Sequence, residues 1–298
     1  MRQRHIYAAI REAHTEKGYS IELACELLHV ARSAYHRWAS GKLSRRAAEN
    51  EQLVEKLEQL HAESPDKGYR RLNDNLRHDC GIHVNDKRVL RICRARDIRS
   101  TIKYNNHGCT RRAKTPQYLA ENLLDRQFYA AKPNEKWLTD VTEFKWYEGC
   151  EIHKLYLSAI LDHCDRRIVS YVLSERNDNP LVFKTFDKAV QANPDAQPLF
   201  HSDRGFQYTN RTFHHKLVQV QAGMTQSMSR VAHCIDNGPM EGFWGILKRE
   251  RYYGRRFTSK HELVQMIQQY IRYYNTRRVQ RNLGILMPME KHALCLAA

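Results

Sequence analysis

Paired cysteines of the kind that hold structural zinc are missing from this sequence of 298 residues. Its eight cysteines are scattered, and no two of them have the CxxC spacing of a zinc finger or zinc ribbon. Scattered cysteines in a chain of this length indicate reduced, mostly packed thiols, as in a cytosolic protein. They are Cys25, Cys80, Cys93, Cys109, Cys150, Cys164, Cys234 and Cys295.

Long apolar runs are also missing. No stretch approaches the roughly 20 apolar residues of a membrane span. The first residues, MRQRHIYAAIREAH, are charged throughout and lack the hydrophobic core of a signal peptide. Glycine and proline are scarce, at 13 and 8 residues, while 42% of the residues are hydrophobic, which is typical of a folded chain. We therefore expect a soluble intracellular protein with one sizeable core and one or two small modules.

Acidic residues are in the minority, since 33 Asp and Glu stand against 49 Lys and Arg and leave a net charge of +16. Such an excess most often indicates a polyanionic partner, because cations that neutralise phosphates release bound counterions. The alternative is a basic surface that is merely solvated.

The first part of the chain, residues 1–42, is predicted to be a small helical module. Ser20 is expected to cap a helix with an apolar face, and a second helix, ARSAYHRW, follows after a short break. Helix, tight turn and basic helix is the helix-turn-helix pattern, whose second helix enters the DNA major groove. Arg32 and Arg37 would then contact DNA, although many helical hairpins share this pattern.

A second helical module is predicted over residues 43–98, and it ends in an element that Asn85 is expected to cap. Its cations exceed what solubility requires, so we predict that they contact phosphates. The predicted contact residues are Arg70, Arg71, Lys87, Arg88 and Arg91. Residues 99–133 are expected to form a basic linker, in which Arg111 and Arg112 would follow a nucleic-acid backbone.

The pattern changes at about residue 134. Three runs of β-branched, aromatic and alternating residues are separated by short turns, which predicts three antiparallel strands. Helices then alternate with two short strands, PLFHS and residues 224–228, before two long helices at about 239–251 and 260–277. This order predicts an α/β domain over residues 134–298, with a mixed five-stranded sheet flanked by helices.

Three acids stand out by their positions. Asp140 lies inside a predicted strand, where a charge is unfavourable unless it is paired or bound. Asp203 ends the fourth predicted strand, and ligands of open α/β sheets gather outside the carboxyl ends of strands. Glu241 lies in the first turn of a helix. Each also has an ordinary interpretation: a paired strand residue, a turn residue, and an acid that complements the helix dipole.

The three acids would form a metal site if they converged at one sheet edge. Carboxylates that hold two Mg²⁺ or Mn²⁺ ions about 3.5–4 Å apart are typical of phosphoryl transfer. Lys248 shares a helix face with Glu241, from which it would reach a phosphate, and Arg249 continues the basic run. Trp244 on the same helix is predicted to be a packing residue.

At these residues the sequence resembles a known family. WLTDVTEF, HSDRGFQY, QSMSR and DNGPMEGFWGILKRE occur in this order, and matching segments extend from SIELACELLHVARSAYHRW to the closing YIRYYNTRRVQRNLGILMPMEK. Together they resemble the second-reading-frame (OrfB) transposases of bacterial insertion sequences. Those proteins are members of the DDE superfamily, which includes the retroviral integrases. The resemblance covers nearly the whole chain.

The resemblance implies an RNase H-like catalytic core in which Asp140, Asp203 and Glu241 form the metal-binding triad. It further implies that His201 and Asn237 support the triad by shaping a strand end and a loop. The implied partners are double-stranded DNA, at terminal inverted repeats and at a target, other copies of the chain on DNA, and an upstream-frame helix-turn-helix protein. The implied location is the bacterial cytoplasm, at the nucleoid.

Two further functions stay open beside that of an active Mg²⁺-dependent transposase. One is a structure-specific nuclease with the same core but no strand transfer. The other is a DNA-binding regulator of transposition whose core has lost activity. The three intact acids favour the transposase, although 37 residues separate Asp203 from Glu241, slightly more than the family usually has.

Overall fold

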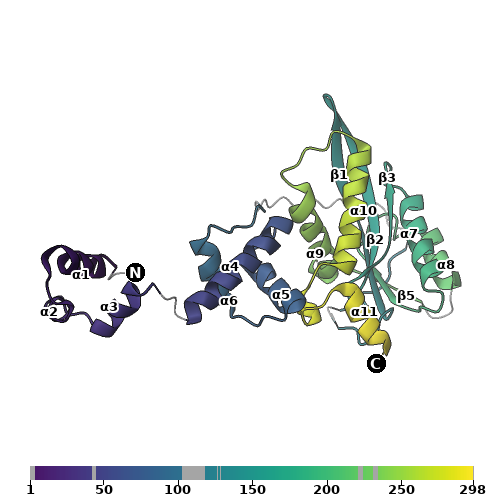
Figure 1. Cartoon of the computed structure of the whole chain (residues 1–298). Coiled ribbons are helices and arrows are strands. Elements are labelled where there is room, and N and C mark those ends of the chain that lie inside the picture. Colours follow the sequence, from purple (N-terminus) through teal and green to yellow (C-terminus); the bar gives the residue numbers. More distant parts are fainter. Residues whose placement is uncertain are drawn as a thin grey trace.

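The computed structural model describes residues 4–41, 45–102, 118–125, 127, 129–220, 224–230 and 234–297. Figure 1 shows two small groups of helices, followed by a larger domain built on a sheet. None of the helices within these ranges is both long enough and apolar enough to cross a membrane.

The first group consists of three short helices whose apolar faces enclose a small core. Tyr7, Ile10, Cys25 and Tyr35 are buried in it. Ser20 occupies the N-cap position of the second helix with an extended backbone, as predicted, but its side chain makes no capping hydrogen bond. The helices are α1 (Arg4–Lys17), α2 (Ile21–Leu27) and α3 (Arg32–Ala39).

The second group is a three-helix unit with a core of aliphatic side chains. Leu57, Leu72 and Val89 are completely buried between its helices. Asn85 caps the last helix as predicted, because its side-chain oxygen accepts a hydrogen bond from the backbone N–H of Lys87 at 2.8 Å. The helices are α4 (Arg45–Glu63), α5 (Tyr69–Cys80) and α6 (Asp86–Ala95).

A five-stranded sheet with the strand order β3-β2-β1-β4-β5 forms the centre of the third group. The pairs β1–β2 and β2–β3 are antiparallel, whereas β1–β4 and β4–β5 are parallel. The predicted mixed five-stranded sheet flanked by helices is confirmed. The strands are β1 (Lys136–Glu148), β2 (Glu151–Asp162), β3 (Ile168–Ser174), β4 (Leu199–Ser202) and β5 (Thr225–Met228).

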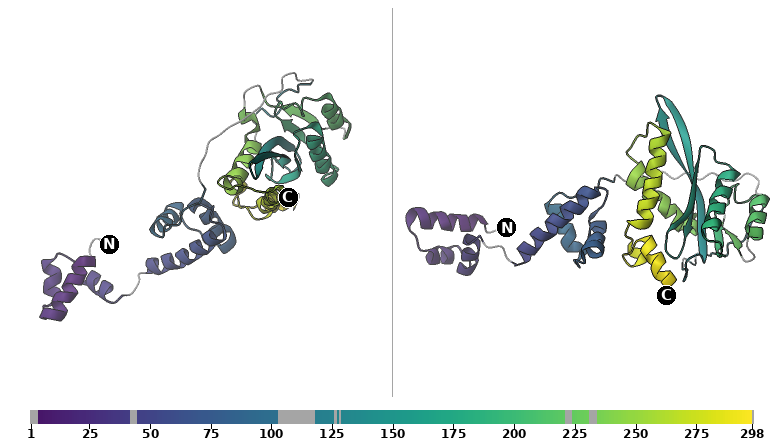
Figure 2. Two further views of the ribbon diagram at one scale, coloured as in Figure 1. Left: turned by 90° about the horizontal axis from the view of Figure 1, so that it is seen from above. Right: turned by 45° about the vertical axis from the view of Figure 1, so that its right-hand side comes forward.

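Helices cover both faces of the sheet because apolar side chains of β1 project to both sides (Figure 2). On one face, Trp137 packs in a cluster with Phe186 of α7 and Phe213 of α8. On the other face, Phe144 belongs to a cluster with Tyr270 of α10 and the apolar side of α9. The helices are α7 (Asn179–Ala192), α8 (Arg211–Val220), α9 (Gly238–Leu247), α10 (Lys260–Thr276) and α11 (Pro288–Ala297).

The helix that begins at Gly238 ends differently from the prediction of one helix to about residue 251. Its α-helical geometry stops at Leu247, and a π-helical turn, η2 (Lys248–Tyr252), continues it. The backbone N–H of Tyr253 donates to the carbonyl oxygen of Lys248, five residues back, at 2.7 Å. Such a turn places one extra residue in the helix and changes the direction of the side chains that follow.

The aromatic cluster beside β4 gives a test of this packing. We expect Phe213→Ala to lower the free energy of unfolding by about 3–5 kcal/mol, because the completely buried ring leaves a cavity. Its ring centroid lies 5.6 Å from that of Phe186 and 5.7 Å from that of Phe200. The matched control Phe206→Ala removes a ring that is 48% exposed and should cost less than about 1 kcal/mol. Urea denaturation followed by circular dichroism measures both, and equal costs would contradict this packing.

Candidate active site

Asp140 and Asp203 lie next to each other because of the register between β1 and β4. That parallel pairing ends where Thr139 lies opposite Ser202. Asp140 and Asp203 are the next residues on the two chains, and neighbouring strands are about 4.8 Å apart. The sheet therefore brings two of the three predicted acids to one edge, at the carboxyl ends of both strands.

Glu241 comes to this edge on α9. Pro239 stands in the first turn of the helix, as the sequence predicts, and Glu241 follows in the same turn. Met240, Phe243 and Leu247 are buried and hold α9 against the sheet, whereas Glu241 is exposed.

The pKa values of all three carboxyls are raised, by burial and, at Asp140 and Glu241, by neighbouring carboxylates. Burial and the charge of Asp203 raise the pKa of Asp140, and the charge of Glu241 adds a smaller contribution. Partial desolvation and the charge of Asp203 also raise the pKa of Glu241, and burial raises that of Asp203. A bound cation would reverse these shifts, because a nearby opposite charge favours the ionised carboxylate. The cluster therefore has the electrostatics of a cation-binding site.

Both carboxylate oxygens of Asp140 accept hydrogen bonds. The backbone N–H of Val141 donates to Oδ1 at 2.7 Å, and the indole Nε1–H of Trp244 donates to Oδ2 at 3.0 Å. Trp244 packs in the core, as predicted, but it also orients the first acid from the helix that carries the third. The sequence does not reveal this donor, since the contact joins residues far apart in the chain and follows no local spacing.

The carboxylate of Asp203 turns back over the loop that follows it. The backbone N–H of Gly205 donates to Oδ1 of Asp203 at 2.9 Å. A Cβ atom on Gly205 would lie only 2.9 Å from this same oxygen, so a larger residue here would force the carboxylate of Asp203 to move. The side chain of Arg204 reaches the residue after β5 instead, where its Nε donates to the carbonyl oxygen of Ser229 at 2.8 Å.

The two predicted supporting residues hold the backbone around the acids. His201 is completely buried, with Nδ1 2.9 Å from the hydroxyl of Ser227 and Nε2 3.1 Å from that of Ser229. Burial lowers the pKa of His201 to about 4, so the ring is neutral at neutral pH. The side-chain amide of Asn237 donates to the carbonyl oxygen of Thr139 at 3.1 Å. These contacts join β4 to β5 and the start of α9 to β1.

An ion pair that the sequence interpretation missed joins the end of β5 to the segment before α9. The Nε and Nη2 atoms of Arg230 each lie 3.1 Å from a carboxylate oxygen of Asp236, which is completely buried. Asn122 donates to the same carboxylate at 3.0 Å. Arg230 ends the motif QSMSR, and Asp236 begins the motif DNGPMEGFWGILKRE. Their places in these motifs are the sequence signal from which the pair could have been predicted.

Lys248 faces the acids from the start of the π-helical turn. Its ammonium nitrogen lies 5.2 Å from the centre of the Phe144 ring, on β1. Burial lowers the pKa of Lys248, while the charges of Asp140 and Glu143 favour its protonated form. Arg249 lies along α9, since a Cβ on Gly245 would come within 3.3 Å of its guanidinium.

The predicted DNA-contact residues of the helical modules differ in exposure and in pairing. Five have exposed side chains: Arg32, Arg37, Arg70, Lys87 and Arg91. Three form ion pairs: Arg32 with Glu22, Arg71 with Asp66, and Arg88 with Glu49. Arg111 and Arg112 lie outside the described residues. These positions do not test contact with DNA, which stays a prediction.

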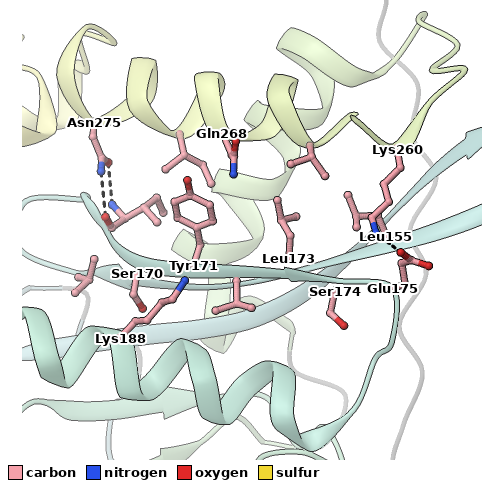
Figure 3. Close-up of a pocket in the computed structure, with 15 residues that line it drawn as sticks. Leu155, Ser170, Tyr171, Leu173, Ser174, Glu175, Lys188, Lys260, Gln268 and Asn275 are labelled. Carbon is pink, nitrogen blue, oxygen red and sulfur yellow. Dashed lines mark hydrogen bonds and ion pairs between the residues drawn. The ribbon is translucent and has the colours of Figure 1, made fainter. Parts of the chain in front are cut away.

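A groove of about 580 Å³ lies away from the acids, along β3 between α7 and α10 (Figure 3). β3 is an edge strand, separated from β1 by β2. The side chain of Asn275 pairs with both the N–H and the carbonyl oxygen of Ile168, at 2.9 and 3.0 Å. Lys260 forms an ion pair with Glu175 at the other end. The groove is thus a feature of the sheet edge and not of the candidate site.

Comparison with known proteins identifies the family. Two models described as integrase core domain match residues 130–234 and 222–288, and one described as HTH-like domain matches residues 48–105. The chain is 39% identical to the putative transposase InsK of insertion sequence element IS150 from Escherichia coli (strain K12), over 75% of this chain and 76% of that protein. It belongs to the insertion-sequence transposases.

The transposase is also 33% identical to the uncharacterized 31 kDa protein of insertion element IS600 from Shigella sonnei, over 89% of this chain and 95% of that protein. Among solved structures, the HTLV-2 integrase catalytic core domain in complex with magnesium is 17% identical, with a TM-score of 0.43 over 55% of this chain and 99% of that one. The predicted family is confirmed. Its members are polynucleotidyl transferases whose integrase core depends on divalent metal ions.

The indole donor gives a prediction for the transposase that does not depend on turnover. Trp244→Phe keeps the aromatic ring but removes the hydrogen bond to Asp140, so we expect Mn²⁺ to bind about tenfold more weakly or worse. Titration with Mn²⁺, with the free ion followed by electron paramagnetic resonance, measures the affinity.

Trp146→Phe is the matched control for this measurement. Its indole donates to Oε1 of Glu148 at 3.1 Å, near the tip of the β1–β2 hairpin, so its loss should leave Mn²⁺ affinity unchanged. If both variants bind Mn²⁺ as the unmodified transposase does, Trp244 does not orient Asp140 for metal binding.

Proposed function

We propose that this transposase binds the ends of its insertion sequence and then cuts and joins DNA at the site of Asp140, Asp203 and Glu241. The observation that carries the proposal is the end of the parallel pairing between β1 and β4, which sets two acids side by side. The electrostatic effect of both Asp203 and Glu241 on Asp140 supports a single three-carboxylate site.

The donor set fits a pair of Mg²⁺ or Mn²⁺ ions. Three carboxylates supply hard oxygen ligands, and their mutual repulsion would be relieved by divalent cations. Among the described residues, no three Asp, Glu, His or Cys side chains converge on one ion. Asp140, Asp203 and Glu241 would together hold the ions, since Mg²⁺ needs few protein carboxylates and commonly fills its remaining positions with water and phosphate oxygens.

When bound, two such ions supply activation of an attacking water or hydroxyl and stabilisation of the leaving 3′-oxygen. The residues around them hold the reactants. Trp244 and Val141 fix the carboxylate of Asp140, and the N–H of Gly205 fixes that of Asp203. Lys248, which lies over Phe144 beside Asp140, would bind a phosphate oxygen of the DNA.

DNA recognition is assigned to the helical modules. Lys87, Arg91 and Arg94 have exposed side chains and lie four and three residues apart along α6, so they share one face of that helix. Three cations on one exposed helix face suit the phosphates and base edges of a duplex. Terminal inverted repeats are the proposed ligand of this face, and the target DNA would be held nearer the acids.

The test incubates the purified transposase and Mg²⁺ with a labelled inverted-repeat end and a target DNA. Joined products should form, and Asp203→Asn should reduce them by about 10³-fold or more, because metal ions contribute several kcal/mol of charge stabilisation to the transition state. Asp195→Asn, on an exposed loop, is the matched control and should leave the yield unchanged.

The products separate this proposal from the other functions of the same fold. Cleavage without joined strands would indicate a structure-specific nuclease. Binding to the labelled end with neither product would indicate a regulator with an inactive core. Joined products that persist in Asp203→Asn would rule out the proposed triad.

A further inference from the structure

Opposite charges are buried where the second helical group meets the catalytic domain. Glu250 of the π-helical turn is 8% exposed, and Asp66, in the loop between α4 and α5, is 5% exposed. Buried carboxylates are costly unless they are paired, so their partners determine what this junction does.

Glu250 binds groups from both sides of the junction. Its Oε1 lies 2.9 Å from Nη1 of Arg71, on α5, and 2.9 Å from Nη2 of Arg278, just after α10. The hydroxyl of Tyr270 donates to its Oε2 at 2.9 Å. One carboxylate from the helix that follows Glu241 thus holds an arginine of the helix-turn-helix-like group.

Asp66 makes the reciprocal contact. It accepts hydrogen bonds from Nη1 of Arg71 at 3.0 Å, within its own group, and from Nη1 of Arg251 at 3.1 Å, across the junction. Burial opposes ionisation of Asp66, but the two arginines outweigh it and hold its pKa below the usual value. Two adjacent residues of the π-helical turn, the anion Glu250 and the cation Arg251, therefore each form an ion pair with the second helical group.

A second set of charges continues the junction toward the C-terminus, where α5 lies beside the segment between α10 and α11 (Figure 1). Nε of Arg281 lies 2.7 Å from Oδ1 of Asp74, and its Nη1 lies 3.0 Å from Oδ2 of Asp86. His78 on α5 bonds to Glu290 on α11 at 2.9 Å. The contact is thus made in two separate places.

The π-helical turn connects this junction to the acids. Lys248 and Glu250 are two residues apart, roughly half a turn of this helical segment, so they project to nearly opposite sides. Lys248 faces Phe144 and Asp140, while Glu250 faces Arg71 and Arg278. The same π-helical turn therefore contacts the second helical group through Glu250 and holds Lys248 near Asp140.

We propose that Arg71 and Glu250 are positioning residues that fix the helix-turn-helix-like group, residues 45–102, against the catalytic domain. Fixing it sets the distance from the exposed cations of α6 to the acids, and so selects the phosphodiester that is cut. This inference rests on the proposed function for its effect on cleavage, whereas the docking itself is a property of the free protein. It also gives Arg71 a role other than the DNA contact predicted for it.

The test compares two neighbouring arginines in the full-length chain. Arg71→Gln removes the contact with Glu250, whereas Arg70→Gln changes an exposed side chain that stacks on Tyr69. Without DNA, backbone hydrogen exchange in α5 and in the turn 248–252 should become about tenfold faster or more in Arg71→Gln alone, with β1 and β2 unchanged. A residue that only contacts DNA would not alter exchange in the free protein.

The labelled inverted-repeat end gives the second measurement. The unmodified protein should cut at one phosphodiester, and Arg71→Gln should spread the cuts over neighbouring positions. Arg70→Gln should reduce affinity for the end but retain the single position. Arg281→Gln, in the second set of charges, should reproduce the effects of Arg71→Gln, so the outcome does not depend on how one variant folds.

Unchanged exchange in both Arg71→Gln and Arg281→Gln would overturn the inference. Faster exchange throughout the catalytic domain would overturn it as well, since Arg71 would then support the fold generally. The inference would also be overturned if Arg71→Gln showed faster exchange in α5 and the turn 248–252 but still cut at a single phosphodiester. If the unmodified protein does not cut at all, the proposed function fails, while the exchange data still decide whether the groups are docked through these charges.

Discussion

Parallel pairing between β1 and β4 is the constraint on which the rest of the site depends. Within this short ladder Trp137 lies opposite Phe200, and both side chains are completely buried in the same cluster. A slip of one residue between the strands would place the two rings on opposite faces of the sheet, so packing fixes the register. The register then brings Asp140 beside Asp203, although their charges repel. Apolar burial under the sheet thus holds together two acids at its edge.

α9 unites the remaining parts of the site. It contributes Glu241 and the indole that orients Asp140, and it leads directly into the turn that carries Lys248. Its buried side is part of the cluster formed with α10 and β1. A displacement of this helix would therefore move an acid, a hydrogen-bond donor and a cation together, which explains why the motif DNGPMEGFWGILKRE spans the whole element.

The sequence was sufficient for the sheet and for the positions of the acids, because both depend on local signals. Strand periodicity, short connections and the placement of Asp203 at a strand end are all readable along the chain. The donor role of Trp244 and the pairing of Arg71 with Glu250 were not readable. Each joins residues that are distant in the chain, and the composition of a helix does not say which of its charges will be buried. Ser20 stands at the N-cap as predicted, but a suitable residue type does not ensure the side-chain geometry of a capping hydrogen bond.

The junction between the helical group and the catalytic domain consists largely of guanidinium and carboxylate groups. Surfaces of this kind regain their hydration when they separate, whereas a separated apolar interface would leave patches that promote aggregation. Arginine is also the side chain best matched to phosphate oxygens in shape and charge. Phosphates of a polyanion therefore compete with the carboxylates of the junction for the same arginines. The contact between the helical group and the catalytic domain is thus sensitive to the salt and polyanions around the protein.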